Sequence, residues 1–122
     1  MKGIHDNLIA IKSKNFALRC IRLYKVVTTT RNEFVLSKQL LRSGTSIGAN
    51  IREAIRAQSK ADFIAKMSIS LKEASESEYW LELLTETNFL TSEEGTSMIA
   101  DCQELISILT KIIKSAKAGN HA

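Results

Sequence analysis

A serine flanked by glycines is the clearest candidate for a reactive side chain. Gly44, Ser46 and Gly48 have the G-x-S-x-G spacing of a hydrolase nucleophile, and Asp101 and His121 follow in the order of a catalytic triad. Such a nucleophile needs a strand before the serine and a helix after it, because the sharp turn between them exposes the hydroxyl. Helical periodicity instead runs through both flanks of Ser46. We therefore interpret the match as accidental and expect no catalytic residues.

The sequence offers few ligands for a metal ion. The two histidines, His5 and His121, lie near opposite ends of the sequence, and Cys20 and Cys102 lack the paired C-x-x-C spacing of zinc sites. Helical bundles that hold two metals use Glu-x-x-His pairs, but no histidine accompanies the glutamates of residues 73–82. We expect no metal and no cofactor, and we interpret both cysteines as buried thiols.

Length and composition favour one soluble helical domain. The 122 residues include no proline and only five glycines, so the turn signals of a many-stranded β-protein are missing. No apolar stretch approaches the roughly 20 residues of a membrane span, and the start lacks the pattern of an export signal. These features predict a cytoplasmic protein with no membrane partner and no small-molecule substrate.

Charge is distributed unevenly along the chain. Residues 1–72 contain 14 Lys and Arg against four acids, whereas residues 73–110 contain nine acids and no Lys or Arg. Clustered cations bind nucleic acid by releasing counterions from its phosphates, so an anionic partner is one interpretation. The alternative is that the two halves attract each other, within the fold or across subunits.

Apolar residues recur at helical spacing in four segments, which predict helices over residues 14–29, 33–58, 60–87 and 92–117. Ser13 is a candidate N-cap for the first, and residues 4–12 are a candidate extra helical turn. The third and fourth segments begin with capping boxes, at Ser59 and Thr91. Four helices of similar length with short connections pack most simply as an antiparallel up-and-down bundle. We predict an all-α four-helix bundle that forms a single domain over residues 1–122.

The third segment has apolar residues on two faces. Ile69 and Trp80 project from the side opposite Leu71, with Leu83 nearby, and a monomer would leave that side exposed to water. Because Trp is a favoured interface anchor, this face predicts self-association. The alternative is that the helix is central and covered on both sides.

Small and polar residues on the second segment extend the predicted interface. Ser43 and Asn50 lie beside its core stripe and would permit close approach of another helix. On the third segment, Glu78 lies on the core stripe, where a carboxylate needs a partner. Arg42, Asn50 and Tyr24 are the candidates for that structural link.

One stretch carries a family resemblance. The sequence of residues 40–54, LLRSGTSIGANIREA, followed by Lys72-Glu73, Glu76 and Tyr79-Trp80-Leu81, resembles bacterial four-helix-bundle proteins encoded within intervening sequences of 23S ribosomal RNA genes. The fold is also similar to the accessory protein of diversity-generating retroelements, a basic oligomer that assists a reverse transcriptase. The resemblance implies a homo-oligomer, as a pentameric ring, without enzymatic activity. It leaves the molecular role open, and the gene location suggests an association with RNA.

The outward cations of the first two segments are the predicted contacts to RNA phosphates. They are Lys14, Arg22, Lys25, Lys38, Arg52 and Arg56. Aromatic residues make up only 6% of the sequence and form no stacking motif, which predicts poor sequence specificity. The alternative function is an oligomeric scaffold for protein interactions that binds no nucleic acid.

Overall fold

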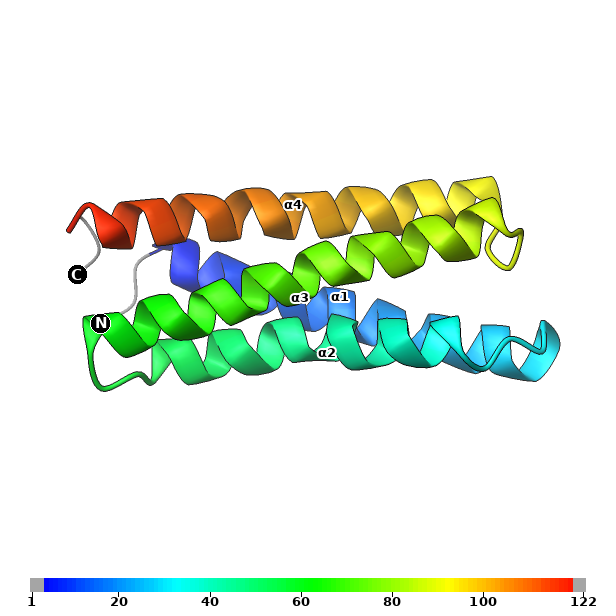
Figure 1. Ribbon diagram of the computed structural model, residues 1–122, viewed down its shortest axis with the longest axis horizontal. Coiled ribbons are helices and arrows are strands. Elements are labelled where there is room, and N and C mark those ends of the chain that lie inside the picture. Colours follow the sequence, from blue (N-terminus) through cyan, green and yellow to red (C-terminus); the bar gives the residue numbers. More distant parts are fainter. Residues whose placement is uncertain (1–3, 120–122) are drawn as a thin grey trace.

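The chain forms four long helices connected by short turns. The computed structural model describes residues 4–119, with side chains from residue 7 onward. Helix α1 is Ile4–Thr30, α2 is Leu36–Ile55, α3 is Lys60–Glu86 and α4 is Ser92–Lys117. Successive helices run in opposite directions, as Figure 1 shows. The predicted all-α bundle is confirmed.

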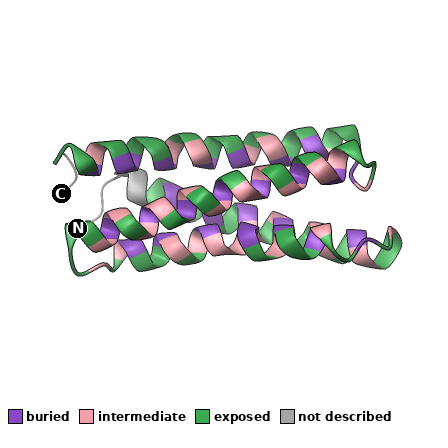
Figure 2. Ribbon diagram, in the orientation of Figure 1, coloured by how far each residue is buried: buried purple, intermediate pink, exposed green. Residues whose placement is uncertain are grey.

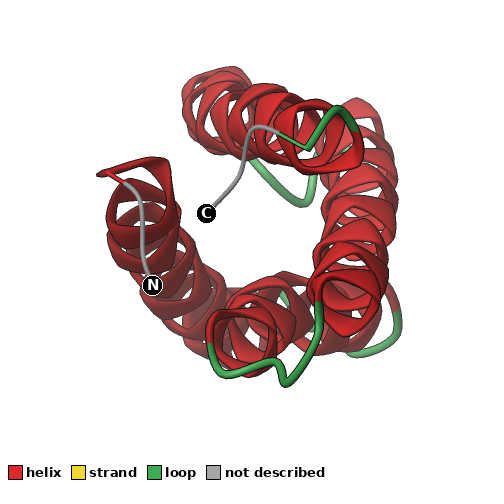
Figure 3. Ribbon diagram, turned by 90° about the vertical axis from the view of Figure 1, so that its left-hand side faces the viewer, coloured by secondary structure: helices red, strands yellow, loops and turns green. Residues whose placement is uncertain are grey.

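The helices surround one apolar core. Each helix turns one stripe of buried residues inward and leaves its outer face exposed (Figure 2). Seen end-on, α1, α2, α3 and α4 follow one another around an arc (Figure 3), and α1 contacts α4 less than any other neighbouring pair does. No helix within residues 4–119 is long and apolar enough to cross a membrane.

Helix α1 begins ten residues before the predicted start. Ser13 is not its N-cap, because Ser13 is buried inside the helix, where its hydroxyl donates to the Ala10 carbonyl oxygen at 3.1 Å. Ile9 is fully buried and continues the stripe of Phe16. No glycine or proline interrupts residues 4–12, so the helix can continue through them. This extension buries Ile9 in the core.

Helix α2 begins later than predicted because Glu33 caps it. The Glu33 carboxylate accepts hydrogen bonds from the backbone N–H groups of Val35, Leu36 and Ser37, at 3.0, 2.8 and 2.7 Å. Asn32 has a φ of 57°, a left-handed conformation that ends the preceding turn. Burial of the Glu33 carboxyl raises its pKa, but the backbone hydrogen bonds outweigh burial and lower the pKa overall.

The predicted caps of α3 and α4 are present. The Ser59 hydroxyl accepts from the Asp62 N–H at 3.0 Å. At α4 both halves of the capping box form, since Thr91 Oγ1 accepts from the Glu94 N–H and Glu94 Oε1 accepts from the Thr91 N–H. These bonds satisfy N–H groups that a helix leaves free in its first turn.

Candidate nucleic-acid interface

Several cations of the basic half are neutralised within the chain. Across the α1–α4 seam, Lys12 pairs with Glu104 at 3.1 Å and Arg19 with Asp101 at 2.6 Å. Arg31, just after α1, pairs with Glu94 in a two-pronged contact at 2.8 and 3.0 Å. The attraction between the two halves therefore operates within the fold along this seam.

A second set of ion pairs joins α2 to α3. Arg42 contacts Glu73 at 3.2 Å and also pairs with Glu76. Lys66 pairs with Glu53 at 3.0 Å. The Arg42 guanidinium is therefore paired with carboxylates of α3 and is not among the unpaired cations.

The six predicted phosphate contacts belong to a larger set of cations that have no ion-pair partner among the described residues; the others are Lys60, Lys72, Lys111, Lys114 and Lys117. All six are exposed. Helical spacing places Lys38, Arg52 and Arg56 on one side of α2, because the separations of 14 and 18 residues are close to whole numbers of turns. Lys14 and Lys25, 11 residues apart, share one side of α1 by the same reasoning.

Lys14 and Arg52 meet at one groove between α1 and α2. This groove has a volume of about 240 Å³, and its other lining residues are small: Ala10, Ser13, Ala17, Thr45, Gly48 and Ala49. The helices approach closely here, since a Cβ added at Gly48 would lie 3.3 Å from the Ser13 hydroxyl oxygen. Two cations flank a groove whose lining contains no carboxylate among the described residues.

Arg22 lies on the other flank of α1. It lines a hollow on the α4 side with Arg19, Leu23, Val26, Glu94 and Met98. The sequence grouped Arg22 with the other five cations, but the structure separates it from the groove of Lys14 and Arg52.

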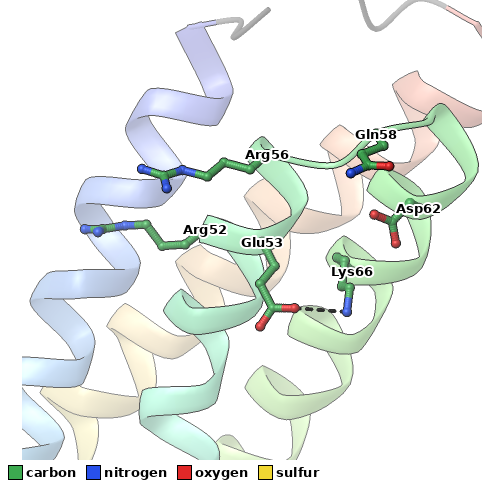
Figure 4. Close-up of a pocket in the computed structure, with 6 residues that line it drawn as sticks. All are labelled: Arg52, Glu53, Arg56, Gln58, Asp62 and Lys66. Carbon is green, nitrogen blue, oxygen red and sulfur yellow. Dashed lines mark ion pairs between the residues drawn. The ribbon is translucent and has the colours of Figure 1, made fainter.

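The hollow between the end of α2 and the start of α3 has mixed charge. In Figure 4, Arg52 and Arg56 extend on the α1 side, away from Glu53, Asp62 and Lys66. The Glu53–Lys66 pair and the Asp62 carboxylate occupy the other side. Since these carboxylates would repel an anion, only the α1 side of this hollow presents positive charge without an adjacent acid among its described lining residues.

The predicted interface residues on α3 lie on its outer face to different degrees. Ile69 is 41% exposed, and Leu83 is half-buried. Trp80 is also half-buried, packs partly against the core and donates its indole N–H to Glu76 at 3.3 Å. Tyr79, which the sequence did not single out, is 54% exposed and its ring lies 5.4 Å from that of Trp80.

The two predicted interface residues on α2 differ in accessibility. Ser43 is fully buried within one chain, where its hydroxyl lies 2.7 Å from that of Ser77. It offers no surface to a second subunit, so we remove it from the interface. Asn50 remains partly exposed, and its amide donates to the Ser46 carbonyl at 2.9 Å.

None of the three predicted partners of Glu78, which were Arg42, Asn50 and Tyr24, bonds to it in the described part of the chain. Gln103 on α4 donates its amide to Glu78 at 2.8 Å, whereas Arg42 and Asn50 bond elsewhere. Glu78 is only partly buried, at the edge of the α3–α4 seam, so a polar amide is sufficient.

The described residues do not assemble a reactive centre from the candidates considered. Ser46 lies inside α2 with helix on both sides, and Asp101 is bound to Arg19. His121 and the side chain of His5 fall outside the described residues. Burial raises the pKa of both thiols, Cys20 and Cys102, to about 12, with smaller contributions from Cys102 for the first and Glu78 for the second.

The predicted absence of a metal site can be compared with the placement of the possible ligands in residues 7–119. Among the described residues, no group of three His, Cys, Asp or Glu side chains is placed to hold a metal ion.

An exposed apolar strip on α1 was not predicted from the sequence. It consists of Leu8, Ile11, Leu18, Ile21 and Val26, of which Ile11 is 61% exposed. The signal was present in the sequence, since apolar residues occur around the whole circumference of α1 rather than on one stripe.

The fold and the charge pattern define an all-α bundle with unpaired cations on its α1–α2 face. The family model of the 23S rRNA-intervening sequence protein matches residues 5–111, and the chain belongs to this family. A similar solved structure is that of a protein of unknown function from the S23 ribosomal protein family of Bacteroides thetaiotaomicron. The two are 55% identical with a TM-score of 0.90, and the match covers 91% of this chain and 99% of the other. No curated protein matches the chain.

Proposed function

We propose that this protein is a nonenzymatic homo-oligomer that binds RNA, or another nucleic acid, through its phosphate backbone. The observation that carries the proposal is the division of its cations. Five cations are paired within the chain, while eleven exposed ones have no ion-pair partner among the described residues, and six of these eleven lie on α1, on α2 or directly after α2. Cations that are already free of carboxylates can bind phosphates without breaking an internal pair.

The family relationship supports the same proposal. The family description refers to sequences that interrupt 23S rRNA, and the solved relative is assigned to a ribosomal protein family. Both descriptions connect such proteins with ribosomal RNA or its genes.

Salt dependence tests phosphate binding directly. We expect a structured RNA to bind at 50 mM salt and to lose about a thousandfold in affinity by 200 mM if six phosphates are contacted. The triple variant Lys38→Gln, Arg52→Gln, Arg56→Gln should weaken binding strongly. A matched control, Lys111→Gln, Lys114→Gln, Lys117→Gln, removes the same charge from exposed positions of α4. Absence of binding at every salt concentration, or equal weakening in both variants, would reject this interface.

Self-association rests on the apolar residues that one chain leaves exposed. Ile69 and Tyr79 on α3 would lose contact with water in an oligomer, whereas the exposed strip on α1 shares its side of that helix with Lys14 and Lys25. The family resemblance favours a pentameric ring. Light scattering should give the mass of several chains, and Ile69→Asp should lower it, whereas Ser75→Asp on the same helix should not. A wild-type mass of one chain at micromolar concentration would contradict the proposal.

The same exposed apolar strip favours the second candidate, an oligomeric scaffold for other proteins. That function requires no nucleic acid. It would be preferred if the chain oligomerises but no RNA binds at any salt concentration.

A further inference from the structure

The free cations of the α1–α2 face form two rows. At 1.5 Å per residue, Lys14 and Lys25 mark about 17 Å along α1. Lys38, Arg52 and Arg56 mark about 27 Å along α2, which runs antiparallel to α1. The two rows therefore lie side by side along neighbouring helices.

The groove where Lys14 of one row and Arg52 of the other meet carries one sign of charge. Lys14 and Arg52 face each other across a groove lined by small, uncharged residues, with no acid among the described residues that line it. Glu53, the acid adjacent to Arg52, is paired with Lys66 on the α3 side (Figure 4). A polyanion can thus approach both rows without meeting a carboxylate in the groove.

The described residues of helices α1 and α2 present no exposed aromatic ring for stacking, although Phe34 is exposed just before α2, four residues ahead of Lys38. Among the described residues of α1 and α2, Phe16 is buried and Tyr24 is half-buried. The exposed rings of Phe34 and Tyr79 lie in the α1–α2 connection and on α3. Proteins that bind single strands combine a basic groove with aromatic side chains on which bases stack, so half of that combination is missing here.

Building on the proposed function, we infer that the α1–α2 face binds a double helix across one of its grooves. Lys14 and Lys25 contact the phosphates of one strand, and Lys38, Arg52 and Arg56 contact those of the other. Packed helices lie about 8–10 Å apart, and long cationic side chains on either side extend that span to two backbones separated by the major groove of B-DNA, about 12 Å wide, or by the wide minor groove of A-form RNA. A single strand would neutralise only one row.

Fluorescence anisotropy with four labelled probes tests this inference. The probes are an RNA duplex and a DNA duplex of about 20 base pairs, and one unpaired strand of each, all measured at 50 and 200 mM salt. We expect the full-length protein to bind a duplex at least about tenfold more tightly than the corresponding single strand. Comparison of the two duplexes identifies which double helix is preferred.

A double variant locates the effect. Lys14→Gln, Arg52→Gln should lower duplex affinity and reduce the slope of log affinity against log salt by about two. It should also reduce the duplex-to-single-strand ratio. The control Lys111→Gln, Lys117→Gln removes equal charge from α4 and should keep the wild-type ratio. Thermal melting followed by circular dichroism verifies that both variants are folded.

The possible results separate the two proposals. Equal binding of duplex and single strand, or tighter binding of the single strand, overturns this inference but leaves phosphate binding intact. An unchanged ratio in Lys14→Gln, Arg52→Gln also overturns it. If none of the four probes binds at 50 mM salt, the proposed function itself fails.

Discussion

Arg31 and Glu94 connect the end of α1 to the start of α4 through two hydrogen bonds, of 2.8 and 3.0 Å. The same carboxylate accepts the Thr91 N–H at 2.8 Å and so completes the capping box of α4. Arg31 also donates to the Phe89 carbonyl in the α3–α4 connection. The Glu94 carboxylate thus caps α4 and also holds the end of α1 beside it.

Glu94→Gln is expected to destabilise the protein in a pH-dependent way. The hydrogen bond from Arg31, followed by that from the Thr91 N–H, lowers the pKa of Glu94 from 4.5 to about 2. A lowered pKa stabilises the fold above pH 4.5, and this contribution is lost as the pH falls towards 2. We expect a loss of about 1 kcal/mol in the free energy of unfolding at pH 7, shrinking at acid pH.

Urea unfolding at pH 7 and at several acid pH values measures this difference. Glu93→Gln provides the control, because it removes the same charge from an exposed neighbour in the first turn of α4. A gap between wild type and Glu94→Gln that does not change with pH would contradict the assignment.

Gly44→Ala is expected to destabilise the bundle, although alanine ordinarily favours a helix over glycine. A Cβ at this position would lie 2.5 Å from Cys20 Sγ and 3.3 Å from Cys20 Cβ, so the Cys20 side chain or one of the two helices must shift. Overpacking of this kind costs about 1–3 kcal/mol. Chemical denaturation should show that the same substitution costs much less in a Cys20→Ala background. An equal cost in both backgrounds would mean that the thiol is not the obstacle.

Glu33→Ala is expected to loosen the start of α2. The substitution leaves the N–H groups of Val35, Leu36 and Ser37 without their carboxylate acceptor, at a cost of about 1–2 kcal/mol. Hydrogen exchange followed by NMR should show faster exchange at these amides than in wild type. Glu86→Ala, an exposed site at the end of α3, should leave their exchange rates unchanged. Unaltered protection in Glu33→Ala would refute the capping role.

Cys20 and Cys102 are expected to resist thiol reagents in the folded protein. Burial raises both pKa values to about 12, so almost no thiolate is present at pH 8. Ellman's reagent should react with two thiols in denaturant and with neither in buffer. Ser107→Cys, at an exposed position of α4, provides a site that reacts rapidly under the same conditions. Comparable reaction of Cys20 or Cys102 would show that the core opens readily.

The α-helical class and two helix starts could be predicted from local patterns. The Ser59 cap and the capping box at Thr91 depend on residues three positions apart, so the sequence identifies both helix starts directly, although at Ser59 the structure shows only the bond from the Asp62 N–H to the serine hydroxyl. The Glu33 cap was missed because the prediction placed Glu33 inside the helix of residues 33–58, whereas Glu33 precedes α2 and its carboxylate accepts from three N–H groups at the start of that helix. Ser13 was assigned to a helix start because a serine can serve either there or inside a buried seam.

Which cations are free depended on the tertiary structure. The sequence separates a basic half from an acidic half, but it does not show that Arg19 meets Asp101 while Arg52 pairs with no carboxylate of residues 7–119. Partners such as Lys12 and Glu104 are distant along the chain, and only the packing of α1 against α4 brings them together.

Helix formation is a local property, because apolar periodicity and caps act over a few residues. The sequence alone therefore determined the all-α bundle. Ion pairing and burial depend on which faces meet. The structure therefore decided that Ser43 is buried against Ser77, that Arg22 lies apart from Lys14, and that the groove of Lys14 and Arg52 carries no acid among its described lining residues. These relationships join side chains on different helices, and their distances are set by helix packing rather than by spacing in the sequence.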